Sequence, residues 1–125
     1  MQANRGSIVI VEDDVCLNRA VARLLTVAGF ESLGLYSAEA LLADTAAIGA
    51  DCFVLDLDLP GMSGLELLQG LRSAGITRPV IFITAHDDLQ RSRAARAGVS
   101  CLLKPFSGTA LLHAVNAALA ASDPH

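Results

Sequence analysis

Short apolar runs alternate with amphipathic segments five times along this chain, and this order limits the folds that it can adopt. Runs that are short, apolar and bounded by turn residues are typical of buried strands. The predicted strands span residues 7–11, 31–36, 52–57, 79–84 and 99–103. Apolar residues at helical spacing between them predict helices. The predicted helices span residues 14–28, 38–47, 64–74, 87–97 and 108 onward.

Strands that alternate with helices predict a parallel sheet with helices on both faces and right-handed crossovers. The 125 residues suffice for one such α/β domain, a doubly wound (βα)5 unit with a five-stranded sheet in the order 2-1-3-4-5. In sheets of this kind a site lies beyond the carboxyl ends of the strands, at the switch point between the first and third strands.

The composition raises the alternative of a membrane protein, since 53 % of the residues are hydrophobic and the mean hydropathy is +0.50. A sheet buried on both faces explains this content equally well, and no apolar run approaches the ~20 residues that span a bilayer. With no signal peptide visible, we expect a soluble, cytoplasmic protein that binds no membrane. The net charge of −4 argues against nucleic-acid binding. The isolated Cys16, Cys52 and Cys101 are interpreted as reduced core thiols.

An acidic residue stands where the third apolar run ends, in the order Cys52-Phe53-Val54-Leu55-Asp56-Leu57-Asp58. A carboxylate in or just beyond a buried strand is costly unless something compensates its charge. Asp56 is therefore either a solvated loop acid or a reactive carboxylate held at the mouth of the sheet.

Other polar residues follow the remaining strands and are expected at the same edge: Glu12 and Asp13, Thr84, and Lys104, the only lysine. Each has an ordinary explanation, such as a cap for the first helix or a surface lysine. Together, however, the carboxylates repel one another by about 4 kcal/mol per pair at ~4 Å and a dielectric of ~20. Oxygen ligands of this kind suit Mg²⁺. A carboxylate beside Mg²⁺, a lysine and a hydroxyl is suited to receive a phosphoryl group.

The chain resembles the receiver domains of two-component response regulators, which have the flavodoxin-like or CheY-like fold, over almost its full length. The segments that carry the resemblance are Val11 to Asp14, Asp56 to Gly64, Thr84-Ala85 and Lys104-Pro105-Phe106. The resemblance implies a receiver domain at residues 5–121 and a tail at 122–125. It also implies a phosphoacceptor with self-catalysed phosphotransfer and dephosphorylation, not a turnover enzyme.

By this resemblance, Asp56 accepts the phosphoryl group from a phosphohistidine on a sensor histidine kinase or a histidine phosphotransfer protein. Asp13, Asp56 and the backbone carbonyl of Asp58 would bind Mg²⁺, for which Mn²⁺ can substitute, and Glu12 would act through a bound water. Lys104 would bind the phosphoryl oxygens. Thr84 would swing toward the phosphoryl group, and Pro105, often preceded by a cis peptide bond, would fix the loop.

The resemblance further implies that phosphorylation switches the face formed by residues 87–97, the strand at 99–103 and the last helix, which is also a candidate homodimer surface. Arg91, Arg93 and Arg96 are either part of that surface or a solvated helix face. Receivers commonly carry Tyr or Phe three residues before the lysine, where this chain has Cys101. The usual aromatic readout is therefore in question.

Two alternatives remain from the residues alone. The pair Asp56 and Asp58 also resembles the first motif of haloacid-dehalogenase-type phosphatases, although that motif normally follows the first strand and no acidic metal-binding pair follows Lys104. The other alternative is a receiver-like docking module that is never phosphorylated.

Overall fold

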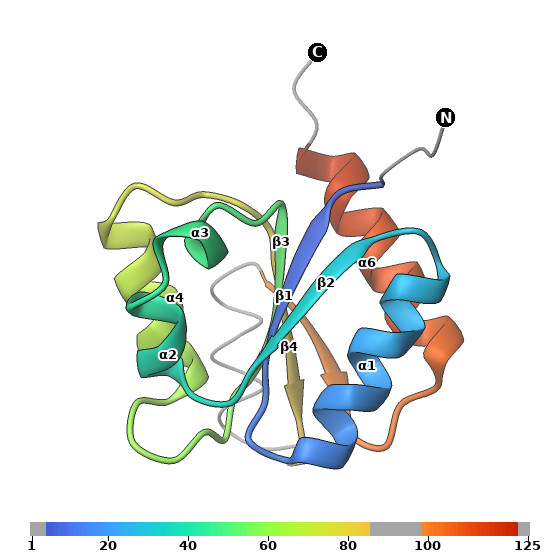
Figure 1. The fold of residues 1–125 in the computed structure, drawn as a ribbon, viewed down its shortest axis with the longest axis horizontal. Coiled ribbons are helices and arrows are strands. Elements are labelled where there is room, and N and C mark those ends of the chain that lie inside the picture. The colour runs from blue at the N-terminus through green and yellow to red at the C-terminus, as the bar shows by residue number, and fades with distance from the viewer. Residues whose placement is uncertain (1–4, 86–98, 123–125) are drawn as a thin grey trace.

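All five predicted strands are present, and they pair in the predicted parallel order. The computed structural model describes residues 5–85 and 99–122 (Figure 1). The strands are β1 (Ser7–Val11), β2 (Glu31–Leu35), β3 (Cys52–Asp56), β4 (Val80–Thr84) and β5 (Ser100–Leu103). Their order across the sheet is β2-β1-β3-β4-β5, with every pair parallel. The fold class expected from the sequence is confirmed.

The helices within the described residues form two groups, one on each face of the sheet (Figure 1). They are α1 (Val15–Val27), α2 (Ala38–Leu42), α3 (Thr45–Ile48), α4 (Gly64–Ser73) and α6 (Gly108–Ser122). Helices α1 and α6 cover one face, and α2, α3 and α4 cover the other. The helix predicted at 87–97 lies outside the described residues.

The central strands are buried on both faces, which explains why their sequences are continuously apolar rather than alternating. Successive side chains of β3 enter opposite cores: Phe53 and Leu55 pack toward α2–α4, while Cys52 and Val54 pack toward α1 and α6. None of these four side chains is exposed to solvent. No helix within the described residues is long and apolar enough to cross a membrane.

The prediction of one helix at 38–47 was wrong, because the segment forms two short helices separated at Ala43 and Asp44. The backbone of Asp44 is extended, and its carboxylate accepts a hydrogen bond from the N–H of Ala47 at 3.0 Å. Asp44 thereby caps the second helix, which prevents the first from continuing.

The expectation that all three cysteines are core thiols was wrong for Cys16, which is exposed on α1. Cys52 is buried and Cys101 is partly buried, and all three are free thiols. Burial raises the pKa of Cys52 to about 12, so this thiol stays protonated.

Gly64, the first residue of α4, allows the helix to approach the end of β3 closely. A Cβ at this position would lie 2.5 Å from the carbonyl oxygen of Asp56 and 2.9 Å from the Cα of Leu57. Both are backbone atoms, which cannot move aside as a flexible side chain can. The glycine therefore sets how closely α4 packs behind the strand end that carries Asp56.

We expect Gly64→Ala to lower the free energy of unfolding by about 1–3 kcal/mol, because the methyl group would overpack this contact. Gly70→Ala in the same helix is a matched control, since nothing lies within 4 Å of a Cβ there. That change should raise the free energy by about 0.5–1 kcal/mol, because alanine is the better helix former. Urea unfolding of both variants measures the difference, and equal effects would contradict the close approach at Gly64.

Candidate functional site

Polar side chains from four strand ends lie together at the carboxyl edge of the sheet. Glu12 and Asp13 follow β1, Asp56 ends β3, Thr84 ends β4 and Lys104 follows β5. Because the four strands are parallel neighbours, their ends meet at the same edge. The sheet thus brings together residues that are far apart in sequence.

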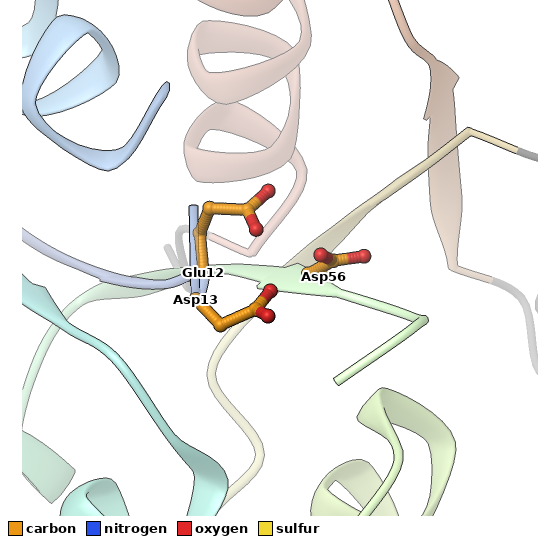
Figure 2. Close-up of side chains that lie close together, drawn as sticks. All are labelled: Glu12, Asp13 and Asp56. Atoms are coloured by element: carbon orange, nitrogen blue, oxygen red, sulfur yellow. The ribbon is translucent and has the colours of Figure 1, made fainter. Parts of the chain in front are cut away.

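Three carboxylates form the centre of this edge, as Figure 2 shows. One oxygen from each of Glu12, Asp13 and Asp56 lies within 4.8 Å of the others. Glu12 and Asp56 are only 1 % and 2 % exposed, whereas Asp13 is exposed. Two of the three acids therefore lie close together with little water to screen their charges.

Lys104 contacts both buried acids. Its Nζ lies 2.7 Å from Oε1 of Glu12 and 3.2 Å from Oδ2 of Asp56. Its backbone N–H donates to the carbonyl of Thr84 at 2.7 Å, which anchors the lysine next to β4. One ammonium group therefore serves two carboxylates, with Asp13 beside them.

Burial and neighbouring charge alter the pKa values of this cluster. Burial raises the pKa of Glu12 to about 7. The contact with Lys104 lowers this pKa in part, and the nearby Asp56 raises it further. For Lys104, burial alone would lower the pKa, but its interactions with Glu12 and Asp56 outweigh that effect and raise the pKa. Lys104 therefore stays charged, while Glu12 is poorly stabilised as an anion.

The donor set fits a small, hard cation. All the clustered ligand atoms are carboxylate oxygens, which such cations prefer. Oε1 of Glu12 is buried and accepts no hydrogen bond of good geometry within the described residues, despite the ionic contact with Lys104. A cation near this oxygen and Asp13 would supply the positive charge that one lysine cannot provide.

Asp58 and Thr84 are joined by a hydrogen bond beside Asp56. The Thr84 hydroxyl donates to Oδ2 of Asp58 at 2.8 Å, and the Asp58 N–H donates to Oδ1 of Asp56 at 2.9 Å. Thr84 is fully buried, while Asp58 is exposed. These contacts connect the end of β4 to the loop that follows β3.

Asn18 supports the site from behind and was missed by the sequence analysis. Its amide group donates to the carbonyl of Glu12 at 2.9 Å and to the carbonyl of Leu35 at 2.8 Å. The side chain is 1 % exposed. A polar residue on the otherwise apolar face of α1, in line with Val21 and Leu25, was the available signal.

Asp14 serves as the N-cap of α1 and accepts a hydrogen bond from the N–H of Leu17 at 3.2 Å. The capping role considered for Glu12 and Asp13 thus belongs to the next residue, Asp14. The backbone N–H of Asp14 also donates to Oε2 of Glu12 at 3.0 Å, which orients that carboxylate.

A groove with a volume of about 470 Å³ opens beside the acids. Its lining consists of Asp14, Leu17, Ala85 and the segment 104–106. The peptide bond between Lys104 and Pro105 is cis. The groove is apolar apart from Asp14 and Lys104, and it reaches the lysine that contacts Asp56.

The remaining candidate residues lie away from the acids or outside the described residues. Cys101 lies on β5 beside Phe82 of β4 and packs against the core under α2–α4. Arg91, Arg93 and Arg96 lie outside the described residues.

Comparison with known proteins gives one consistent result. The family model described as the response regulator receiver domain matches residues 8–116. Nodulation protein W of Bradyrhizobium diazoefficiens is 38 % identical over 93 % of this chain and 52 % of its own length. The transcriptional regulatory protein FixJ of Rhizobium meliloti is 38 % identical over 87 % of this chain and 54 % of its own length. This chain thus spans about half the length of these relatives.

Solved structures agree with this result. The low-resolution structure of the response regulator StyR has a TM-score of 0.82 at 36 % identity, over 92 % of this chain and 59 % of that one. The BeF3-activated DrrB receiver domain has a TM-score of 0.82 at 26 % identity, over 92 % of this chain and 97 % of that one.

Proposed function

This chain belongs to the response regulator receiver domain family, and from this premise we propose that Asp56 is its phosphoacceptor in a two-component phosphorelay. The observation that carries the proposal is the position of Asp56, whose buried carboxylate ends a central strand 3.2 Å from Lys104. Burial withholds the carboxylate from bulk water, and the ammonium group is placed to bind a phosphoryl oxygen. The receiver unit is proposed to span residues 5–121, with 122–125 as a tail.

The proposed reaction transfers a phosphoryl group from a phosphohistidine. A carboxylate oxygen of Asp56 forms a bond to phosphorus, the bond from phosphorus to the histidine nitrogen breaks, and that nitrogen keeps the electron pair and takes up a proton. Lys104 binds the oxygens of the transferring group, and the Thr84 hydroxyl donates to one of them afterwards. The domain supplies these groups to its own acceptor, so it catalyses its own modification rather than turning over a substrate.

Mg²⁺ is the cation proposed for the acidic cluster. Asp13, Asp56 and the backbone carbonyl of Asp58 would hold it, and Glu12 would act through a bound water. When bound, Mg²⁺ neutralises negative charge on the phosphoryl group. The oxygen-only donor set and the single lysine shared by two buried carboxylates support this proposal.

The affinity for Mg²⁺ is expected to rise by roughly tenfold between about pH 6 and about pH 8. Burial raises the pKa of Glu12 to about 7, and its protonated form carries no charge to attract the cation. Glu12→Gln should bind Mg²⁺ more weakly and with a much flatter pH profile, because its amide does not titrate. Titration calorimetry at several pH values measures both profiles, and an equally flat profile for the unmodified protein would contradict the expectation.

The partner is proposed to be a sensor histidine kinase or a histidine phosphotransfer protein. The apolar groove formed by Leu17, Ala85, Pro105 and Phe106 gives such a partner a surface next to Lys104. Phosphorylation is proposed to change the face that includes β5 and α6, through Thr84, Cys101 and Pro105. The longer relatives extend beyond the part that this chain matches, and any regulatory activity of that remainder belongs to those proteins. A corresponding activity for this protein is a proposal.

Incubation with acetyl phosphate and Mg²⁺, followed by intact-mass measurement, tests the phosphoacceptor function. The expected result is one labile phosphoryl adduct that is absent in Asp56→Asn and absent when EDTA is added. Failure to form an adduct with acetyl phosphate and with a cognate kinase would favour the docking module instead. Continuous release of phosphate from small phosphate esters would favour the phosphatase alternative.

A further inference from the structure

The Thr84 hydroxyl is engaged by Asp58 in the unphosphorylated protein. Its proton is donated to Oδ2 of Asp58 at 2.8 Å, an ordinary distance for a hydroxyl hydrogen bond. The two residues belong to different segments, since Thr84 ends β4 while Asp58 lies in the loop after β3. The bond therefore fixes the buried hydroxyl to an exposed acid two residues beyond Asp56.

A threonine hydroxyl has one proton to donate. While that proton is shared with Asp58, it is not shared with an oxygen attached to Asp56. A phosphoryl group on Asp56 would also place a charge of about −1.5 to −2 close to the Asp58 carboxylate. Asp58 thus opposes the phosphorylated state in two ways, by holding a donor that the phosphoryl group needs and by its own negative charge.

The Asp58 side chain is not part of either hydrophobic core. It is exposed, and its hydrogen bond to Thr84 is the side-chain contact that connects it to the site. The backbone N–H that donates to Asp56 belongs to the main chain, so substituting the side chain leaves this donor in place. The carboxylate can therefore be altered while the backbone around Asp56 is kept.

We infer that the Asp58 carboxylate is a positioning residue that holds Thr84 away from Asp56 and thereby weakens the binding of a phosphoryl group. The inference rests on the proposed function of Asp56 as phosphoacceptor. Its distinguishing feature is that the effect of Asp58 passes through Thr84. A carboxylate that acted only by charge repulsion would have the same effect whether or not the Thr84 hydroxyl were present.

Binding of beryllofluoride, a mimic of the phosphoryl group, tests the inference. Dissociation constants are measured by fluorine NMR titration in saturating Mg²⁺ for the unmodified protein and for Asp58→Ala, Thr84→Ala, Thr84→Ser and the double variants. Asp58→Ala should tighten binding by about three- to tenfold, the size expected for one released, partly exposed hydrogen bond to a charged group. The gain should persist with Thr84→Ser, which keeps the hydroxyl. With Thr84→Ala it should fall to the smaller part that charge repulsion alone contributes.

The outcomes separate the two proposals. If the unmodified protein binds no beryllofluoride, the phosphoacceptor function fails and the inference fails with it. If the unmodified protein binds it but Asp58→Ala has the same affinity, or its gain is undiminished with Thr84→Ala, the inference alone is overturned.

Thr84 is fully buried, so circular dichroism must first establish that its variants fold. If Thr84→Ala does not fold, Asp58→Asn with Thr84 left intact decides the question. Its side-chain oxygen still accepts a hydrogen bond from Thr84 but carries no charge. Asp58→Asn should therefore tighten binding less than Asp58→Ala does, and equal tightening would indicate charge repulsion alone and overturn the inference.

Discussion

Lys104→Ala is expected to slow the phosphorylation of Asp56 by about 10²- to 10³-fold, the usual cost of removing one group that stabilises developing charge in a buried site. The ammonium group lies 2.7 Å from Glu12 and 3.2 Å from Asp56, and no other lysine exists in the chain to replace it. The rate is measured by intact mass as a function of time with acetyl phosphate and Mg²⁺.

Two substitutions control for charge and for geometry. Arg78→Ala removes an exposed cation at the opposite end of the sheet, where it lies 3.8 Å from Asp51, and should leave the rate unchanged. Lys104→Arg keeps the positive charge but replaces a compact ammonium with a planar fork, so an intermediate rate is expected. A folded Lys104→Ala variant that is phosphorylated as fast as the unmodified protein would refute the role of this lysine.

Asn18→Leu is expected to lower the free energy of unfolding by about 2–4 kcal/mol. The change removes the bonds to the carbonyls of Glu12 and Leu35 and leaves a buried acceptor without its donor, which costs more than the loss of an exposed bond. A side chain on Gly34 would overlap the amide of Asn18, so the space around this residue is already filled. Chemical denaturation gives the difference in stability.

Asn116→Leu on α6 is the matched control. Its side-chain oxygen accepts a bond from Arg5 at 2.6 Å, but this bond is exposed. The same substitution should therefore cost less than about 1 kcal/mol. If the two substitutions had equal effects, Asn18 would not be the buried bridge described above.

The sheet order could be predicted because a parallel sheet covered on both faces requires continuously apolar strands. The run from Cys52 to Leu55 has this character, and each side chain in it enters one of the two cores. The site at the carboxyl edge could also be predicted, because parallel strands place their last residues at the same edge of the sheet. Glu12, Asp56 and Lys104 came together through topology, and no knowledge of side-chain conformation was needed.

Features that depend on local geometry could not be predicted in this way. The break at Ala43 and Asp44 depended on one aspartate capping a new helix within an apparently continuous helical pattern. The exposure of Cys16 depended on how α1 is rotated against the sheet. The bond between Thr84 and Asp58 joins side chains from separate segments, and its formation depends on rotamers that sequence spacing does not determine.

The most direct test of the central claim is to locate the phosphoryl group. Acyl phosphates are reduced by borohydride, so a phosphorylated aspartate becomes homoserine and can be identified by peptide mass spectrometry after treatment with acetyl phosphate and Mg²⁺. We predict homoserine at position 56 and at no other position. Homoserine at Asp13 or Asp58 with Asp56 intact, or a phosphoryl group on a side chain that borohydride does not reduce, would contradict the assignment of Asp56 as the phosphoacceptor.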